Sequence, residues 1–147
     1  MPLLITLILG LVLALLAVFI HHECLVGIKR GLLGKRTRPR RWHVGATVLM
    51  LLLSHAVVIL VFAVGLLALV NVFELGELNG TQSADISTFV YFSFSSYTSL
   101  GVGDLYPSGH LRLLTGFEAL LGLLMIGWSA SFLYLEMRTL WFAGEIE

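Results

Sequence analysis

The sequence predicts an all-α membrane protein with three transmembrane helices and a short re-entrant segment between the second and the third. Of its 147 residues, 58% are apolar and only 12% are charged, which is too hydrophobic a composition for a soluble domain of this size. Three stretches are long and apolar enough to cross a bilayer, which takes about 20 residues, and a fourth is too short. The charged residues are segregated along the chain, and their positions predict how the helices are oriented.

The first predicted transmembrane helix lies within residues 1–28. Residues 2–20 carry no charged side chain. A cleaved signal peptide is the alternative interpretation, but the N-terminus has no Lys or Arg and no A-x-A-like cleavage site follows the apolar run. We therefore expect this helix to be retained in the membrane.

Four potential metal ligands follow one another at the end of this helix. They are His21, His22, Glu23 and Cys24. Adjacent residues on one helix point in different directions, whereas a metal site needs ligands that converge on one point. A polar cluster at the helix end is therefore the preferred interpretation, and a metal- or redox-controlled gate is the alternative.

Residues 29–43 are predicted to form a basic cytoplasmic loop. Seven of the nine Lys and Arg residues fall between residues 29 and 41, and short basic loops stay on the cytoplasmic side. The N-terminus is therefore expected outside, in a multi-pass protein of the plasma membrane, with a bacterial inner membrane as the expected setting. The charges of residues 29–41 could also contact anionic lipid headgroups. No nucleic acid is needed to explain this cluster.

The second and third transmembrane helices are predicted over residues 44–73 and 111–141, with a short cytoplasmic tail over residues 142–147. The second helix runs outward and the third returns inward, so the acidic loop that follows the second helix lies outside. His55 lies near the middle of the second helix. A helix–helix hydrogen bond is expected there, and a proton sensor is the alternative because histidine titrates near neutral pH.

Residues 86–104 are predicted to dip into the membrane from outside and return to the same side. Residues 86–97 fit a short helix, capped by Asp85 or Ser87, whose negative C-terminal end points toward the bilayer centre. In residues 98–104 two glycines alternate with apolar residues. Glycine lets the backbone turn successive carbonyl groups to one side, and a row of carbonyl oxygens replaces the water shell of a cation. Irregular backbone is tolerated at membrane depth only inside protein or beside a watery cavity.

The segment 98–104 resembles the selectivity-filter signature T-x-G-[YF]-G-D of the prokaryotic potassium-channel family. Ser99 stands at the Thr position, and Gly101, Gly103 and Asp104 match the two glycines and the aspartate. Residues 44–141 as a whole are similar to the two-helix pore module of that family. The helix of residues 1–28 is an addition to this module.

The resemblance implies a carbonyl-lined pore for potassium ions, with no cofactor beyond the permeant ion. The filter residues would be Thr98, Ser99, Leu100, Gly101, Val102 and Gly103. Potassium ions would bind at the carbonyl oxygens of Ser99, Leu100, Gly101 and Val102. Because the filter segment of one chain cannot surround an ion, four copies are needed, and we expect a homotetramer with a central symmetry axis.

Further residues are expected to support or gate this filter. The predicted supports are Asp104, Glu118, Tyr97 and Ser95. Glu118 lies one turn into the third helix and is expected to point toward the pore helix, with a carboxylate at the headgroup interface as the alternative. Its predicted hydrogen-bond partners are Tyr97, Ser95 and Ser96. Gly122 falls where the family often has a hinge glycine, and close helix packing is the alternative.

Three departures from the family pattern bear on ion selectivity. Val102 replaces the aromatic residue usual between the glycines, Leu100 replaces Val or Ile, and Ser99 replaces Thr. A weakly selective sodium and potassium channel is therefore the alternative function, and a non-conducting regulatory membrane subunit is a second alternative. Catalysis is not expected, because no catalytic constellation occurs at workable spacing.

Overall fold

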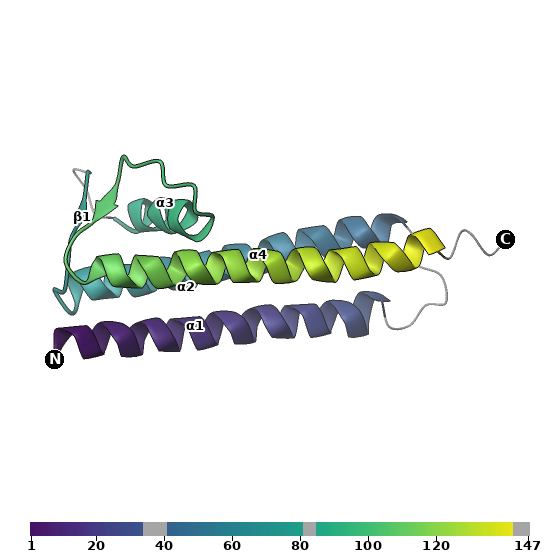
Figure 1. Ribbon diagram of the computed structural model, residues 1–147, viewed down its shortest axis with the longest axis horizontal. Helices are drawn as coiled ribbons and strands as arrows, with labels where there is room; N and C mark the ends of the chain where they lie inside the picture. Colours follow the sequence, from purple (N-terminus) through teal and green to yellow (C-terminus); the bar gives the residue numbers. More distant parts are fainter. Residues whose placement is uncertain (34–40, 81–84, 143–147) are drawn as a thin grey trace.

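Three long helices lie side by side in the computed structural model, which describes residues 1–33, 41–80 and 85–142 (Figure 1). These helices are α1 (Pro2–Gly27), α2 (Arg41–Asn71) and α4 (Leu111–Phe142). Each contains a stretch that is long and apolar enough to cross a membrane. The prediction of an all-α fold with three long apolar helices is therefore confirmed.

The short helix α3 (Ile86–Tyr97) lies against α2 and α4 near the end of the bundle that carries the N-terminus. Figure 1 shows α1 on the opposite side of the α2 and α4 layer. Helices α2, α3 and α4 meet in an apolar core that includes Phe62, Phe89 and Leu114, each 0% exposed. This packing holds α3 rigidly beside the irregular segment that follows it.

The connection between α1 and α2 is shorter than the predicted loop of residues 29–43. The chain stays helical through a π-helical turn, η1 (Ile28–Leu33), and α2 begins at Arg41. The side chain of Ile28 is fully buried in a cluster with Leu25 and Leu51, so burial of an apolar residue favours continuing the helix beyond Gly27. The predicted lipid contact of residues 29–41 falls largely on residues outside the described part of the chain, as does the tail from residue 143 onward.

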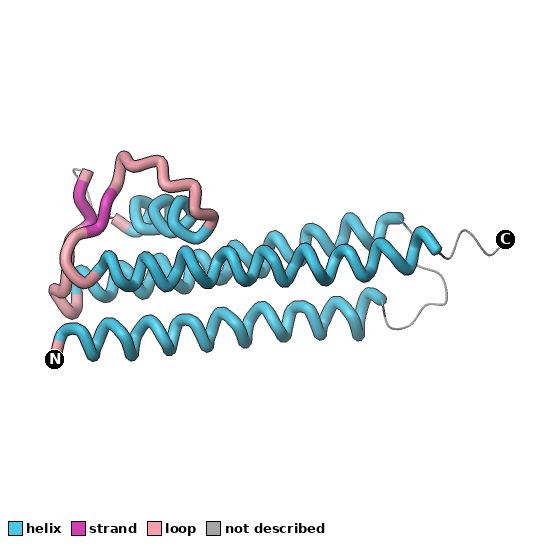
Figure 2. Tube along the Cα trace, in the orientation of Figure 1, coloured by secondary structure: helices cyan, strands magenta, loops and turns pink. Residues whose placement is uncertain are grey.

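A small antiparallel ladder, which the sequence did not predict, joins the two loops that flank α3. Strands β1 (Leu78–Asn79) and β2 (Tyr106–Pro107) pair antiparallel, as Figure 2 shows in magenta. Just outside the ladder, the amide of Ser108 donates to the carbonyl of Glu77 at 2.9 Å. Strands of two residues have no alternation to recognise. The ladder ties the loop before α3 to the loop after it.

Helix α1 packs on the other two long helices through a single stripe. The buried residues of this stripe recur every three or four positions: Thr6, Gly10, Leu13, Ala17, His21 and Leu25. A Cβ added at Gly65 of α2 would collide with the side chain of Leu13, so this side chain packs directly on the α2 backbone. Small and polar residues at such contacts are typical of helix pairs in membranes.

Candidate functional site

Helix α3 starts at a well-formed cap. Asp85 has an extended backbone conformation, and its carboxylate accepts hydrogen bonds from the Thr88 amide (2.9 Å) and the Ser87 hydroxyl (2.9 Å). The prediction that Asp85 or Ser87 caps this helix is confirmed, with Asp85 as the cap. The Thr88 amide, followed by the hydroxyls of Thr88 and Ser87, lowers the pKa of Asp85. The cap is therefore retained at neutral pH and is lost only as the pH falls through that lowered value.

The 98–104 segment is held against α3 mainly by one residue, Ser95. The carbonyl of Ser95 accepts from the amides of Leu100 (2.9 Å) and Gly101 (3.4 Å). Its hydroxyl accepts from the amide of Val102 at 3.4 Å. One residue earlier in the segment, the amide of Ser99 donates to the carbonyl of Ser96 at 3.0 Å.

These bonds determine where the carbonyl groups of the segment point. The chain has no cis peptide bond among its described residues, and in a trans peptide the C=O of one residue points opposite to the N–H of the next. The amides of residues 99–102 face α3. The carbonyls of residues 98–101 therefore point away from α3.

The segment has an unusual backbone that alternates through left-handed conformations. Gly101 has φ = +57° and Gly103 has φ = +87°, which glycine adopts readily because it has no Cβ. Ser99 also has φ = +57°. A non-glycine residue at positive φ is strained, and a β-branched one is more so. This conformation favours Ser99 over the Thr that stands here in the family pattern.

Asp104 is fixed by a hydrogen bond to Tyr91, a pairing that the sequence did not predict. The hydroxyl of Tyr91 in α3 donates to Oδ2 of Asp104 at 2.9 Å, and Oδ1 accepts from the amide of Leu105 at 3.0 Å. Asp104 thus ties the far end of the 98–104 segment back to α3. No local sequence signal pairs these two residues, because they lie 13 positions apart on different elements.

Replacing Tyr91 by phenylalanine is expected to loosen the 98–104 segment and to make its backbone amides exchange with solvent a few-fold faster. The bond to Asp104 raises the pKa of the Tyr91 hydroxyl. The bond is therefore fully present below the ordinary tyrosine pKa of about 10 and is lost as the pH rises through the raised value. Tyr106→Phe, the same change on exposed β2, serves as control. Equal amide exchange rates in the two variants would contradict an anchoring role.

Glu118 is buried between α3 and α4, but its partner differs from those predicted. Its side chain is 0% exposed, and Oε1 is hydrogen-bonded to the hydroxyl of Ser93. The same hydroxyl contacts the carbonyl of Ile59 at 2.8 Å. The carboxylate therefore lies inside the protein, not at the headgroup interface, and points toward the pore helix as expected.

The predicted partners Tyr97, Ser95 and Ser96 were wrong because the two helices run in the same direction. Tyr97 lies opposite Gly122: a Cβ added at Gly122 would collide with the Tyr97 carbonyl oxygen. One turn back on each helix brings Ser93 opposite Glu118. Gly122 thus has a packing reason for being glycine, and α4 continues as a helix through it.

The histidines and potential ligands of α1 and α2 separate into different environments. His55 bonds to the Tyr97 hydroxyl and to Ser129, so the predicted helix–helix hydrogen bond is confirmed. His21 is buried, whereas His22 and Glu23 are exposed. Within the described ranges, no group of three or more His, Cys, Asp or Glu could hold a metal, so the metal-gate alternative finds no convergent site there.

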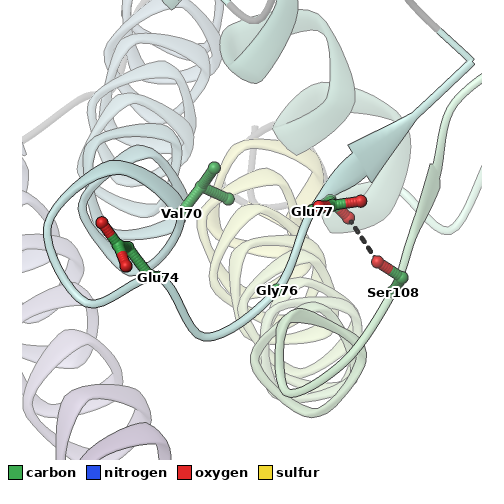
Figure 3. A pocket seen from close by; sticks show the side chains of 5 residues that line it. All are labelled: Val70, Glu74, Gly76, Glu77 and Ser108. Atoms are coloured by element: carbon green, nitrogen blue, oxygen red, sulfur yellow. Dashed lines mark hydrogen bonds between the residues drawn. The ribbon is translucent and has the colours of Figure 1, made fainter.

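Hollows border the loops around α3. One, of about 520 Å³, is lined by Val70, Glu74, Gly76, Glu77 and Ser108 (Figure 3). Figure 3 shows its two carboxylates on opposite sides of Gly76, pointing to different places, so they do not form one ligand set. Another, a groove of about 280 Å³, runs between the 98–104 segment and the first turns of α4 and includes Phe92, Ser99 and Ala119.

The short helix α3 and the irregular 98–104 segment lie between two helices of membrane length. This arrangement defines a pore-loop membrane protein. The family described as ion channel matches residues 45–137, more than half of the chain. The chain belongs to this ion channel family, which is a family of channels and not of enzymes. No curated protein and no solved structure matches the sequence.

Proposed function

We propose that four copies of this chain form a potassium channel of the plasma membrane, which conducts passively through residues 98–103. The observation that carries the proposal is the direction of the four successive carbonyl groups of residues 98–101. They point away from α3 because the following amides bind Ser95 and Ser96. Successive carbonyl groups can replace the hydration shell of a potassium ion.

A fourfold assembly is supported by the apolar side chains that a single chain leaves uncovered. Leu100 and Val102 are 70% and 56% exposed, although they lie in the middle of the proposed filter. The groove of about 280 Å³ beside the segment is lined partly by small residues. We expect the side chains of a neighbouring filter to occupy this groove, so that the ring of four closes around the ion.

The proposed orientation has the N-terminus outside and the C-terminus in the cytoplasm. The N-terminus lies at the same end of the bundle as α3 and the ladder (Figure 1). The basic residues Lys29 and Arg30 lie in η1, which follows the far end of α1. The positive-inside rule assigns that end to the cytoplasm.

A weakly selective cation channel is the second candidate. The observation that favours it concerns Val102. Its side chain is 56% exposed, and the hydrogen bond from its amide to the Ser95 hydroxyl is long at 3.4 Å. An aromatic ring at this position would add packing that valine lacks. A filter with less support would adjust more easily to a smaller ion, so sodium would also bind at the same carbonyl sites.

Purified protein in liposomes with opposing potassium and sodium gradients separates these functions. A potassium-selective channel gives a reversal potential near the potassium equilibrium value, about 59 mV for each tenfold gradient, and is blocked by barium, which is close to potassium in size. A reversal potential near zero would identify the weakly selective channel. No current, with no barium effect, would instead identify a non-conducting regulatory subunit.

A further inference from the structure

A chain of four hydrogen bonds crosses the protein from α1 to the end of α3. His21 of α1 contacts Ser54 of α2 through Nδ1 and Ser129 of α4 through Nε2, each at 3.1 Å. The Ser129 hydroxyl also contacts Nε2 of His55 in α2 at 2.9 Å. Nδ1 of His55 contacts the hydroxyl of Tyr97 in α3 at 2.8 Å. We call these five residues the buried relay.

The relay lies inside the protein and connects its two sides. His21 is 0% exposed and Tyr97 is 1% exposed. Figure 1 places α1 and α3 on opposite sides of the α2 and α4 layer, so the relay is a polar connection through that layer. Polar groups at membrane depth must find partners within the protein, which makes the members of the relay depend on one another.

Counting protons fixes how the relay is ordered. Ser129 has one hydroxyl proton and lies between the Nε2 atoms of two rings, and its hydroxyl has no third partner among the described residues. When both rings are neutral, Ser129 donates to one ring and accepts from the other. His21 and His55 then carry their protons on different nitrogens, one on Nδ1 and the other on Nε2.

The relay has two arrangements that make the same four hydrogen bonds. Its five groups bring five protons when both rings are neutral, so one terminal hydroxyl proton is left without a relay bond. In one arrangement Tyr97 donates to His55, and the idle proton belongs to Ser54. In the other Tyr97 accepts, and its own proton is idle. Whether the Tyr97 hydroxyl donates or accepts is therefore set jointly with the proton positions of His21 and Ser54.

Tyr97 is placed where its hydrogen bonding can affect the proposed ion path. It is the last residue of α3, and the 98–104 segment begins with the next residue. Ser95, two residues earlier, holds three amides of that segment. We propose that the relay makes α1 part of the support of the filter: His21 and His55 are positioning residues that hold the Tyr97 hydroxyl and so fix the end of α3. The inference rests on the proposed function in one respect, that ions pass along residues 98–103.

Three subtractive variants test the relay in liposome recordings of the potassium-to-sodium permeability ratio. Tyr97→Phe and Ser129→Ala each remove a single oxygen atom, and His21→Ala removes the member on α1. Each is expected to change the ratio about threefold or more, since one interhelical hydrogen bond in a membrane shifts an equilibrium by about that factor. The controls are His22→Ala, next to His21 but exposed, and Ser131→Ala, whose hydroxyl bonds within α4. Both controls are expected to keep the wild-type ratio.

The double variant His21→Ala/Tyr97→Phe shows whether His21 acts through Tyr97. We expect it to change the ratio no more than Tyr97→Phe alone, because the two residues belong to one chain. Additive changes would overturn the inference, and so would a wild-type ratio in the His21→Ala channel. If the wild-type protein carries no current, the proposed function fails and not the relay, which is then tested as follows.

Nitrogen NMR of protein labelled with ¹⁵N-histidine examines the relay without ion flow. At neutral pH we expect one of the two rings to be protonated on Nδ1 and the other on Nε2, with assignments from the signals lost in His21→Ala and His55→Ala. Tyr97→Phe is expected to shift the signals of both rings, although it touches only His55. Identical tautomers in the wild type, or a His21 signal that ignores Tyr97→Phe, would overturn the relay.

Discussion

Channels carrying Gly101→Ala are expected to fold and assemble but to lose selective potassium conduction. Gly101 has φ = +57°, a left-handed conformation that costs an L-residue about 1–2 kcal/mol. A Cβ built there meets no atom within 4 Å beyond its chain neighbours, so the penalty is conformational and not steric. The backbone escapes it by rotating peptides whose amides now face Ser95, which turns carbonyls away from the ion. Four subunits together make the penalty about 4–8 kcal/mol.

The decisive measurement is the reversal potential under opposing potassium and sodium gradients. Gly116→Ala is the matched control, because Gly116 lies in helical α4 and a Cβ there also meets nothing within 4 Å. We expect the control to keep the wild-type reversal potential and Gly101→Ala to move it toward zero or abolish the current. Unchanged selectivity in Gly101→Ala would mean that the carbonyls at this position do not choose the ion.

The helices could be predicted because their signals are local. Helix α3 spans Ile86–Tyr97, as the sequence indicated, since it is bounded by the cap at Asp85 and by the segment containing Gly101 and Gly103. The long helices follow from apolar length alone. The end of α1 was harder to predict, because the buried side chain of Ile28 keeps the chain helical where the basic charges suggested a loop.

The partners in the contacts between helices could not be predicted, because they depend on which faces meet and in which direction. His21 and Ser129 are 108 residues apart in the sequence, and neither residue type signals the other. Glu118 was expected to hydrogen-bond to α3, yet its partner Ser93 on that helix follows only from the parallel course of α3 and α4. The stripe of small and polar residues on α1 is the one sequence signal that could have located its packing face. The positive φ of Ser99 has no signal, since serine is not a left-handed residue by preference.

Replacing Gly122 by alanine is expected to destabilise the assembled protein strongly. A Cβ at this position would collide with the Tyr97 carbonyl oxygen, which belongs to the backbone and cannot move without displacing the end of α3. Overpacking a core typically costs about 1–3 kcal/mol, and a backbone clash lies at the upper end of that range. Alanine improves helix propensity by about 1 kcal/mol over glycine, which does not offset the clash.

Thermal unfolding of the purified protein separates close packing from a hinge at Gly122. Gly127→Ala is the control, because Gly127 lies on the same helix and a Cβ there meets nothing within 4 Å. This substitution is expected to raise the unfolding temperature slightly. If Gly122 acts only as a hinge, Gly122→Ala should be as stable as this control while opening of the channel changes. If the contact with Tyr97 decides, Gly122→Ala should unfold at a clearly lower temperature and disturb selectivity, because α3 carries the start of the proposed filter. Equal stability of the two variants would contradict the close approach of α4 to α3, and with it the alignment that sets Ser93 opposite Glu118.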